Sequence, residues 1–268
     1  MRSYVEVTRP AEHVAVVTLN RPERMNAMAF DVMVPVRDAL LETGHDNTVR
    51  AIVLTGAGEA FCSGADQESA GRPPHVEGLA RPAYALRSLE MLEDVILTLR
   101  RLHQPVIAAI NGPAIGGGLC LALACDLRIA SSAAYFRAAG INNGLTASEL
   151  GLSFLLPRAV GSTHAADIMF TGRDVDAEEA ARIGLVSRLA DPVVEAAVEV
   201  GERIGSLSQP GIELTKRTLH AGISATSLES YMPTEGIGQL YLRLLTDNFE
   251  EATRARKEGR AAVFRDGA

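Results

Sequence analysis

The sequence predicts an α/β core followed by a helical C-terminal region. Over the first part of the chain, short apolar runs rich in β-branched residues alternate with segments of helical periodicity, which favours a sheet of mixed or parallel strands. From Ala165 onward the pattern is helical, and near residue 200 the composition changes to all helix. We therefore expect two parts, residues 1–200 and residues 201–268.

The expected strands are short and apolar. Residues 5–20 carry valines at strand-like spacing and predict a hairpin-like pair of strands, which Arg21 and Pro22 end. Three further apolar runs predict buried strands, and the first two lead directly into glycine-containing turns: residues 49–55, 105–110 and 126–130.

The expected helices follow apolar residues at helical spacing, and they cover residues 29–43, 89–102, 193–204, 211–221 and 228–255. Pro233 predicts a break in the last of these, because proline lacks the backbone N–H that a helix interior uses. Asp176 is a plausible start for a further helix. Prolines interrupt residues 68–84, which we expect to form a loop.

Composition excludes several classes of partner and cofactor. A formal net charge of −7 argues against nucleic acid or an anionic membrane surface as the main partner, although an anionic small ligand remains possible. Three cysteines without framework spacing, and no apolar run long enough to span a bilayer, predict a cytoplasmic protein. The six histidines lack metal-ligand spacing, and no dinucleotide or phosphate-loop motif occurs, so we expect no metal, flavin or nicotinamide.

Three consecutive glycines, Gly116, Gly117 and Gly118, run into an apolar segment that looks helical, although glycine destabilises a helix interior. They are either turn and close-packing residues, or they free backbone N–H groups at the positive end of a helix. Such N–H groups bind an anion or a developing oxyanion. Residues 61–66 (FCSGAD) form a second junction of small residues after a strand, so two such groups can meet at one carbonyl oxygen.

Five segments, in order over nearly the whole chain, resemble the crotonase (enoyl-CoA hydratase/isomerase) superfamily. They are NRPERMNA at residues 20–27, AFCSGAD at 60–66, PVIAAINGPAIGGG at 105–118, CDLRIAS at 125–131 and TGRDVDAEEAARIGLV at 171–186. The resemblance implies a crotonase-like ββα spiral core and a helical C-terminal trimerisation region. It also implies a homotrimer, or a hexamer formed as a dimer of trimers.

The resemblance further implies a site for an acyl-CoA thioester, which is the substrate rather than a cofactor. In this family two backbone N–H groups hold the thioester oxygen and stabilise an enolate, and they correspond here to Ala65 and Gly117. A side chain at Gly117 would crowd the thioester. The expected contacts to CoA are Arg24, Met25, Ser63 and Gln67. Arg24 would pair with a phosphate, and the alternative for it is a solvated surface charge.

The sequence departs from the family at the two glutamates with which hydratases handle water and a proton. Cys120 and Gly140 occupy their positions. The nearest carboxyl is Glu149, which in an apolar pocket would have a raised pKa and act as acid or base. The alternative is a helix-start glutamate beside Thr146 and Ser148. Cys120 is either a nucleophile or, more in keeping with its apolar surroundings, a small buried residue.

Three other charged residues near these motifs carry expectations of their own. Asp66 is expected to shape its turn and Asp126 to cap or orient a core element, while Arg137 would contact a polar acyl group or pair with an acid.

The resemblance implies, first, an enoyl-CoA hydratase of fatty acid metabolism, a lyase that adds water to a 2-enoyl-CoA. An enoyl-CoA isomerase, or another acyl-CoA lyase or hydrolase that uses Glu149, is the alternative among enzymes. A protein that binds acyl-CoA without catalysis would keep Ala65 and Gly117 and lose the glutamates. A purely structural protein would have no affinity for CoA.

Overall fold

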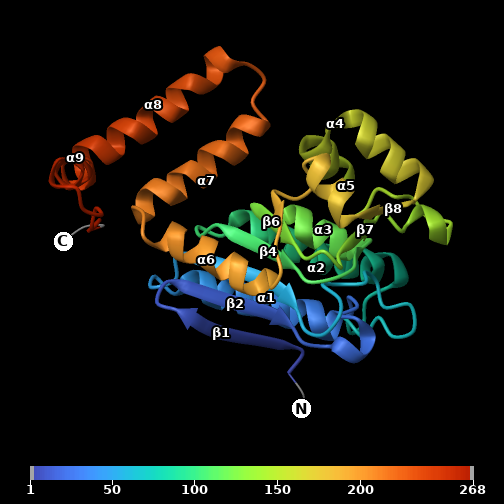
Figure 1. The fold of residues 1–268 in the computed structure, drawn as a ribbon. Helices are drawn as coiled ribbons and strands as arrows, with labels where there is room; N and C mark the ends of the chain where they lie inside the picture. The colour runs from blue at the N-terminus through green and yellow to red at the C-terminus, as the bar shows by residue number, and fades with distance from the viewer. Residues whose placement is uncertain (1–2, 266–268) are drawn as a thin grey trace.

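A six-stranded sheet forms the centre of the computed structural model, which describes residues 3–265 (Figure 1). Its strands, in spatial order, are β1 (Val5–Ala11), β2 (Val14–Leu19), β3 (Ala51–Gly56), β4 (Val106–Ile110), β6 (Leu127–Ala130) and β9 (Arg188–Leu189). β1 and β2 pair antiparallel, and every other neighbouring pair is parallel. The predicted hairpin and the mixed sheet are therefore confirmed.

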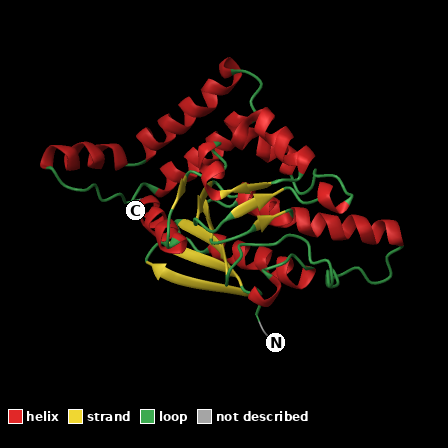
Figure 2. Cartoon of the chain, turned by 45° about the vertical axis from the view of Figure 1, so that its right-hand side comes forward, coloured by secondary structure: helices red, strands yellow, loops and turns green. Residues whose placement is uncertain are grey.

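The central strands β2, β3 and β4 are buried on both faces, which explains why they are mainly apolar runs, whereas β1 is largely exposed. On one face Val53 and Ile107 pack against α6 (Val193–Gly205). On the other face the alternate residues, such as Ile52 and Leu54, join one core with α1 (Phe30–His45), α2 (Arg81–Arg101) and α3 (Gly117–Ala124). Figure 2 shows the helices arranged around the strands.

The other elements surround this core. A second, three-stranded sheet contains β5 (Ala114–Ile115), β7 (Tyr135–Arg137) and β8 (Asp174–Asp176). The remaining helices are η1 (Pro22–Arg24), η2 (Ile141–Asn143), α4 (Leu152–Thr171), α5 (Ala177–Arg182), α7 (Gln209–Ile223), α8 (Leu228–Leu245) and α9 (Asn248–Glu258). α7 and α8 form a helical hairpin that extends away from the sheet (Figure 1). Within residues 3–265, no helix combines the length and the apolar character needed to cross a bilayer.

Two predicted helix boundaries are wrong, and both involve proline. α2 begins at Arg81 rather than at residue 89, because Pro82 lies in its first turn, where a missing N–H costs no helical hydrogen bond. α8 continues through Pro233, and the helical segment breaks at Thr246 and Asp247 instead. Pro233 lies in the second turn, so the loss of one backbone bond near the helix start is tolerated.

The region after residue 150 also differs in detail from the prediction. α4 begins at Leu152, ahead of the predicted position 165, and the short strands β8 and β9 interrupt the helical pattern. Asp176 starts α5 as predicted, since its carboxylate accepts the N–H of Glu179 at 2.8 Å. The predicted division after residue 200 falls inside α6, and it stays a prediction.

Candidate active site

The site lies where the chain leaves two neighbouring parallel strands, β3 and β4. We call residues 62–66 the first arm and residues 114–118 the second arm. A parallel bridge joins Cys62 to Ala114, and the N–H of Ile115 donates to the Cys62 carbonyl at 3.0 Å. The two backbone segments that were predicted to bind one oxygen therefore lie side by side.

Ala65 of the first arm presents an available N–H group. Its neighbours form a bridge to Met28: the N–H of Met28 donates to Gly64 at 2.7 Å, and the N–H of Asp66 donates to Met28 at 3.0 Å. Because successive amides along extended backbone point in opposite directions, the N–H of Ala65 points away from Met28. Ala65 is also exposed, so a ligand can reach this donor.

A different local constraint requires glycine at each of the three positions in the second arm. Gly116 has φ +52°, a conformation that other residues rarely adopt, and it turns the chain into α3. A Cβ on Gly117 would lie 2.3 Å from Met28 Sδ, and one on Gly118 would lie 2.0 Å from the Cys62 carbonyl oxygen. The first obstacle to a side chain at Gly117 is therefore Met28 of this chain.

Gly117 is the first residue of α3, where backbone N–H groups have no intrahelical partner and the helix dipole is positive. The preceding Gly116 provides no side-chain cap. The turn-and-packing explanation and the N–H explanation of the glycines are thus compatible, because close packing of the arms brings the helix start to the site.

Asp66 holds the first arm in place. Its side chain is 0% exposed and contacts Arg21 Nη1 at 2.9 Å and Arg24 Nη2 at 2.8 Å. It also accepts the backbone N–H groups of Glu68 and Ser69, each at 3.0 Å. The hydrogen bond from Arg24 holds the pKa of this carboxyl well below its usual range. The prediction that Asp66 shapes its turn is confirmed, whereas its partner Arg21 was not foreseen.

The residues expected to contact CoA gather around the same arm. The N–H of Ser63 donates to the Met25 carbonyl at 3.0 Å, and Gln67 is exposed next to them. Arg24 is not a free surface charge, because its guanidinium contacts Glu68 at 2.6 Å as well as Asp66. A phosphate at Arg24 would have to share it with these two carboxylates.

Asn26 is a structural residue that the sequence analysis missed. It is fully buried with φ +54°, and its side-chain amide donates to the carbonyls of Ala57 at 2.9 Å and Ala60 at 2.7 Å. Its side-chain oxygen accepts the N–H of Arg21 at 2.9 Å. Asparagine tolerates this backbone conformation, and its amide satisfies buried groups of two loops. The only sequence signal for this role was the presence of Asn26 in the NRPERMNA segment.

Glu149 brings a carboxyl group to the start of α3. Its Oε1 lies 3.2 Å from the point where a Cβ on Gly116 would stand. The residue is half-buried, and burial raises the pKa of the carboxyl. Its backbone carbonyl, rather than its side chain, supports the start of α4 by accepting the N–H of Leu152 at 2.7 Å. The carboxyl is thus directed to the site and does not act as a helix cap.

Cys120 and Gly140 cannot replace the missing glutamates. Cys120 is buried, and burial raises the pKa of its thiol well above the ordinary value, so the reactive thiolate is disfavoured. Its Sγ donates to the Glu149 carbonyl at 3.4 Å. At Gly140, a Cβ would lie 2.2 Å from the carbonyl oxygen of Thr146, so the backbone leaves no room for a side chain.

Arg137 and Asp126 have structural partners. Arg137 forms a two-point ion pair with Asp174 at 2.5 and 2.6 Å, so its pairing with an acid is confirmed. Asp126 accepts the N–H of Val106 at 2.8 Å and contacts Lys216 and His220, each at 2.8 Å. It therefore orients a core element, as predicted, and also ties α7 to the sheet.

Comparison with known proteins gives consistent results. Residues 9–267 match the family model described as enoyl-CoA hydratase/isomerase. The chain is 66% identical to a probable enoyl-CoA hydratase, echA12, of Mycobacterium bovis, over 98% of this chain and 93% of that protein. It is 39% identical to the (E)-benzylidenesuccinyl-CoA hydratase of Thauera aromatica, over 95% of this chain and 96% of that protein.

Solved structures agree with the sequence comparisons. A probable enoyl-CoA hydratase/isomerase from Mycobacterium abscessus superposes with a TM-score of 0.95 at 67% identity, over 99% of this chain and 100% of that one. A monofunctional enoyl CoA isomerase from M. smegmatis superposes with a TM-score of 0.74 at 57% identity, over 86% of this chain and 99% of that one. These likenesses show the crotonase-type fold, and the α/β class that the sequence predicted is confirmed.

Proposed function

Because this chain belongs to the enoyl-CoA hydratase/isomerase family, we propose that it transfers a proton at the carbon next to the thioester carbonyl of an enoyl-CoA, with Glu149 as the acid–base group. The observation that carries the proposal is the position of the Glu149 carboxyl, half-buried beside Gly116 at the start of α3. A carboxyl whose pKa is raised by burial can both accept and return a proton near neutral pH.

The N–H groups of Ala65 and Gly117 would bind the thioester oxygen and stabilise the negative charge that develops on it. Their support is the joined pair of arms, which brings the backbone of the exposed Ala65 next to an uncapped helix start. A single donor of this kind is typically worth about 10²- to 10³-fold in rate. Met25, Ser63, Gln67 and Arg24 would line the approach of CoA, while Glu149 and the two amides would act on the thioester.

Hydration of a 2-enoyl-CoA is the first candidate reaction, and the names of the 66% identical relatives support it. The oxygen of water forms a bond to C3, one water proton goes to the Glu149 carboxylate, and the electron pair moves onto the thioester oxygen. Glu149 then returns the proton to C2, which gives the 3-hydroxyacyl-CoA. One carboxyl suffices for this balance, since the proton that it accepts equals the one that it delivers.

Isomerisation of a 3-enoyl-CoA to the 2-enoyl-CoA is the second candidate. The observation that favours it is the absence of a second carboxylate, because a buried thiol at Cys120 and a sterically closed position at Gly140 occupy the usual places. In this reaction Glu149 removes a proton from C2, and the oxyanion forms at the two amides. Glu149 then delivers the proton to C4 as the double bond shifts.

Turnover of two substrates tests the proposal and separates these reactions. Hydration removes the conjugated enoyl-thioester absorbance of crotonyl-CoA, whereas isomerisation of a 3-enoyl-CoA creates it. We expect Glu149→Gln to lower the active reaction by about 10²- to 10⁴-fold. Glu42→Gln is the matched control, because Glu42 is exposed on α1, and it should keep full turnover.

Binding without turnover is distinguished in the same experiment. If the parent protein leaves both substrates unchanged while CoA thioesters still raise its melting temperature, the catalytic proposal is wrong and the chain is an acyl-CoA-binding protein. If Glu149→Gln keeps the parent's rate, Glu149 is not the acid–base group.

A further inference from the structure

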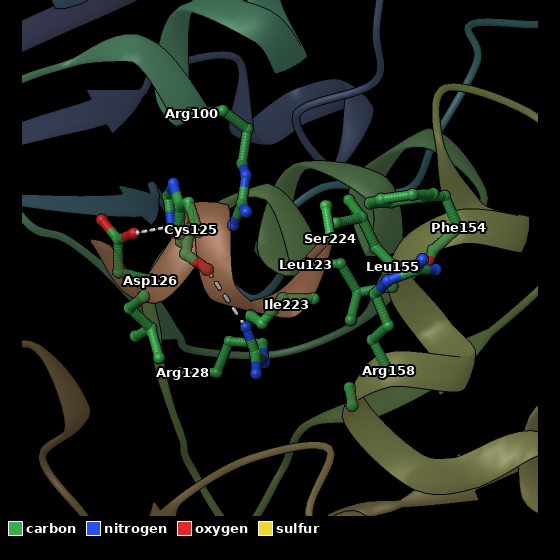
Figure 3. Close-up of a pocket in the computed structure, with 13 residues that line it drawn as sticks. Arg100, Leu123, Cys125, Asp126, Arg128, Phe154, Leu155, Arg158, Ile223 and Ser224 are labelled. Atoms are coloured by element: carbon green, nitrogen blue, oxygen red, sulfur yellow. Dashed lines mark hydrogen bonds and ion pairs between the residues drawn. The ribbon is translucent and has the colours of Figure 1, made fainter. Parts of the chain in front are cut away.

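A cavity of about 120 Å³ lies at the C-terminal end of α3, bounded by α4 and α7 (Figure 3). α3 has eight residues, so at 1.5 Å per residue this cavity lies roughly 12 Å from Gly117 at the other end of the helix. Exposed side chains at its rim, Phe154 and Leu219, open it to solvent. The cavity is thus separate from the proposed thioester site.

The lining of this cavity carries an excess of positive charge. Three arginines, Arg100, Arg128 and Arg158, line it together with His220, and Asp126 is the one carboxylate among its lining residues. Figure 3 shows Arg100 entering from one side and Arg128 from the opposite side. We call these three arginines and the space between them the arginine pocket.

Asp126 does not neutralise the arginine pocket. One of its oxygens contacts Lys216 and accepts the N–H of Val106, and the other lies 2.8 Å from His220. Its direct partners are therefore Lys216 and His220, and it acts on Arg100 and Arg128 only at longer range.

The arginines themselves contact no carboxylate within 4 Å among residues 3–265. Arg128 donates to the carbonyls of Leu185 at 2.7 Å and Cys125 at 3.1 Å, and so caps the C-terminal end of α3. Arg158 donates to the Phe154 carbonyl at 2.8 Å and stacks on the ring of that residue. Among residues 3–265, no hydrogen bond or ion pair within 4 Å involves Arg100, and Asp126 acts on it only at longer range.

Burial makes this arrangement costly without a counter-charge. It lowers the pKa of both Arg100 and Arg128, which means that their charged forms are partly removed from water. Asp126 opposes this effect at both arginines without contacting either, so one carboxylate faces two partly buried guanidinium groups. An anion between the two guanidinium groups would relieve the remaining cost. Guanidinium groups match the oxygens of phosphate through paired N–H donors.

We propose that the arginine pocket binds a small phosphate-type oxyanion between Arg100 and Arg128. The size of the pocket supports a small ligand, since about 120 Å³ is several times the roughly 10–15 Å³ that a single water requires. The exposed Arg158 also lines the site, and the apolar side chains of Leu123 and Leu155 are among its other lining residues.

Calorimetric titration of the full chain with inorganic phosphate tests the proposal, with sodium chloride at equal ionic strength as the reference. We expect saturable binding that Arg100→Gln weakens by about tenfold, because the variant loses a charge-assisted contact. Arg101→Gln is the matched control: Arg101 is exposed, is the next residue on α2 and does not line the pocket. The control should bind as the parent does. Arg158→Gln should weaken binding less, because Arg158 lies at the exposed rim.

Three outcomes would overturn the proposal: no saturable binding by the parent protein, equal binding by Arg100→Gln, or displacement of the phosphate by CoA, which would place it in the thioester site. A titration with glycerol phosphate identifies the source of the anion. Binding of the ester assigns the site to a phosphate group carried by a larger molecule, whereas selective binding of inorganic phosphate assigns it to the free anion. Circular dichroism of each variant checks that the fold is intact.

Discussion

The two arms of the candidate site present equivalent backbone amides, yet different forces hold them. The first arm is fixed by charge: the buried Asp66 contacts Arg21 and Arg24 and accepts two backbone N–H groups. The second arm is fixed by the absence of side chains, since Gly117 and Gly118 allow its backbone to lie against its neighbours. One arm therefore depends on electrostatics and the other on volume.

The comparison also shows that the arms are not independent. Gly118 packs on the carbonyl of Cys62, and a Cβ on Gly64 would lie 2.6 Å from the carbonyl oxygen of Ile115. Each arm therefore supplies a glycine at the point where the two meet. Displacing either arm should therefore move the amide of the other, so variants of both arms should lower the same enzymatic activity. They differ in cause: added volume disturbs the second arm, and loss of charge disturbs the first.

The largest expected effect is that of Gly118→Ala. The new Cβ would stand 2.0 Å from the Cys62 carbonyl oxygen and 2.8 Å from its carbonyl carbon, and these backbone atoms cannot yield as the end of a flexible side chain could. We expect destabilisation of about 1–3 kcal/mol from overpacking. Because the proposed oxyanion donor Gly117 would be displaced, we also expect a loss of about 10²-fold or more in turnover. Thermal unfolding and enoyl-CoA turnover measure the two effects.

Gly236→Ala is the control for this variant. It lies in α8, and a Cβ there meets nothing within 4 Å among the described residues. It should keep parental activity and be neutral or slightly stabilising, as alanine favours helix. Parental turnover by Gly118→Ala would contradict the volume argument for the second arm.

Asp66→Asn removes the charge that holds the first arm. The side chain of Arg21 is 11% exposed and would lose its counter-charge, so we expect the free energy of unfolding to fall by about 3 kcal/mol. Urea denaturation measures this change. Asp38→Asn is the matched control, because Asp38 pairs with Arg37 while its own side chain is 59% exposed, and such surface pairs contribute about 0–1 kcal/mol. Equal losses in both variants would show that the first arm does not depend on the Asp66 charge.

The same carboxylate predicts a pH dependence of stability. The folded-state pKa of Asp66 is lowered, chiefly by the hydrogen bond from Arg24. Its contribution is therefore present above the unfolded value of about 3.9 and is lost as pH falls through the folded value. Urea unfolding of the parent and of Asp66→Asn should be measured at decreasing pH. The difference between their free energies of unfolding should become smaller below about pH 4. If this difference in free energy stays constant with pH, the destabilisation of Asp66→Asn comes from packing and not from the loss of the charge.

The sequence placed the candidate site residues in short motifs, and their roles stay predictions, whereas the contacts that hold those motifs were not foreseen. Ala65, Gly117 and Glu149 lie in short motifs, and the structure brings all three segments to the start of α3. The arginine pocket had no such signal, because Arg100, Arg128 and Arg158 come from three separate elements that only the folded chain brings together. Contacts between distant segments depend on packing, which local patterns do not encode.

The fold shows the same division. Buried strands and the hairpin follow directly from apolar runs, whereas the start of α2 at Arg81 and the continuity of α8 through Pro233 do not. A proline removes one backbone hydrogen bond. Whether that loss ends a helix depends on how far the proline lies from the start of the helix. Leu150 adopts φ +43° beside the catalytic candidate, a conformation for which its sequence gives no indication.

The smallest expected effect concerns Cys120, which links the second arm to Glu149. Its thiol donates to the Glu149 carbonyl at 3.4 Å, so we expect it to position the backbone that carries the carboxyl. Contacts of this type contribute about 0.5–1 kcal/mol, and Cys120→Ala should lower kcat by about two- to fivefold with KM unchanged. The effect is small because the same carbonyl keeps the N–H of Leu152 at 2.7 Å.

Cys125→Ala separates positioning from packing. Its thiol makes a contact of the same length, 3.4 Å, to the Leu121 carbonyl, and it lies just after the C-terminal end of α3. Both variants remove a buried sulfur from the same core, so both should lower the melting temperature to a similar degree. If only Cys120→Ala lowers kcat, the thiol acts through the backbone of Glu149. If both variants lower kcat equally, the loss of activity comes from weaker packing of α3. The site would then depend on the packing at both ends of that helix.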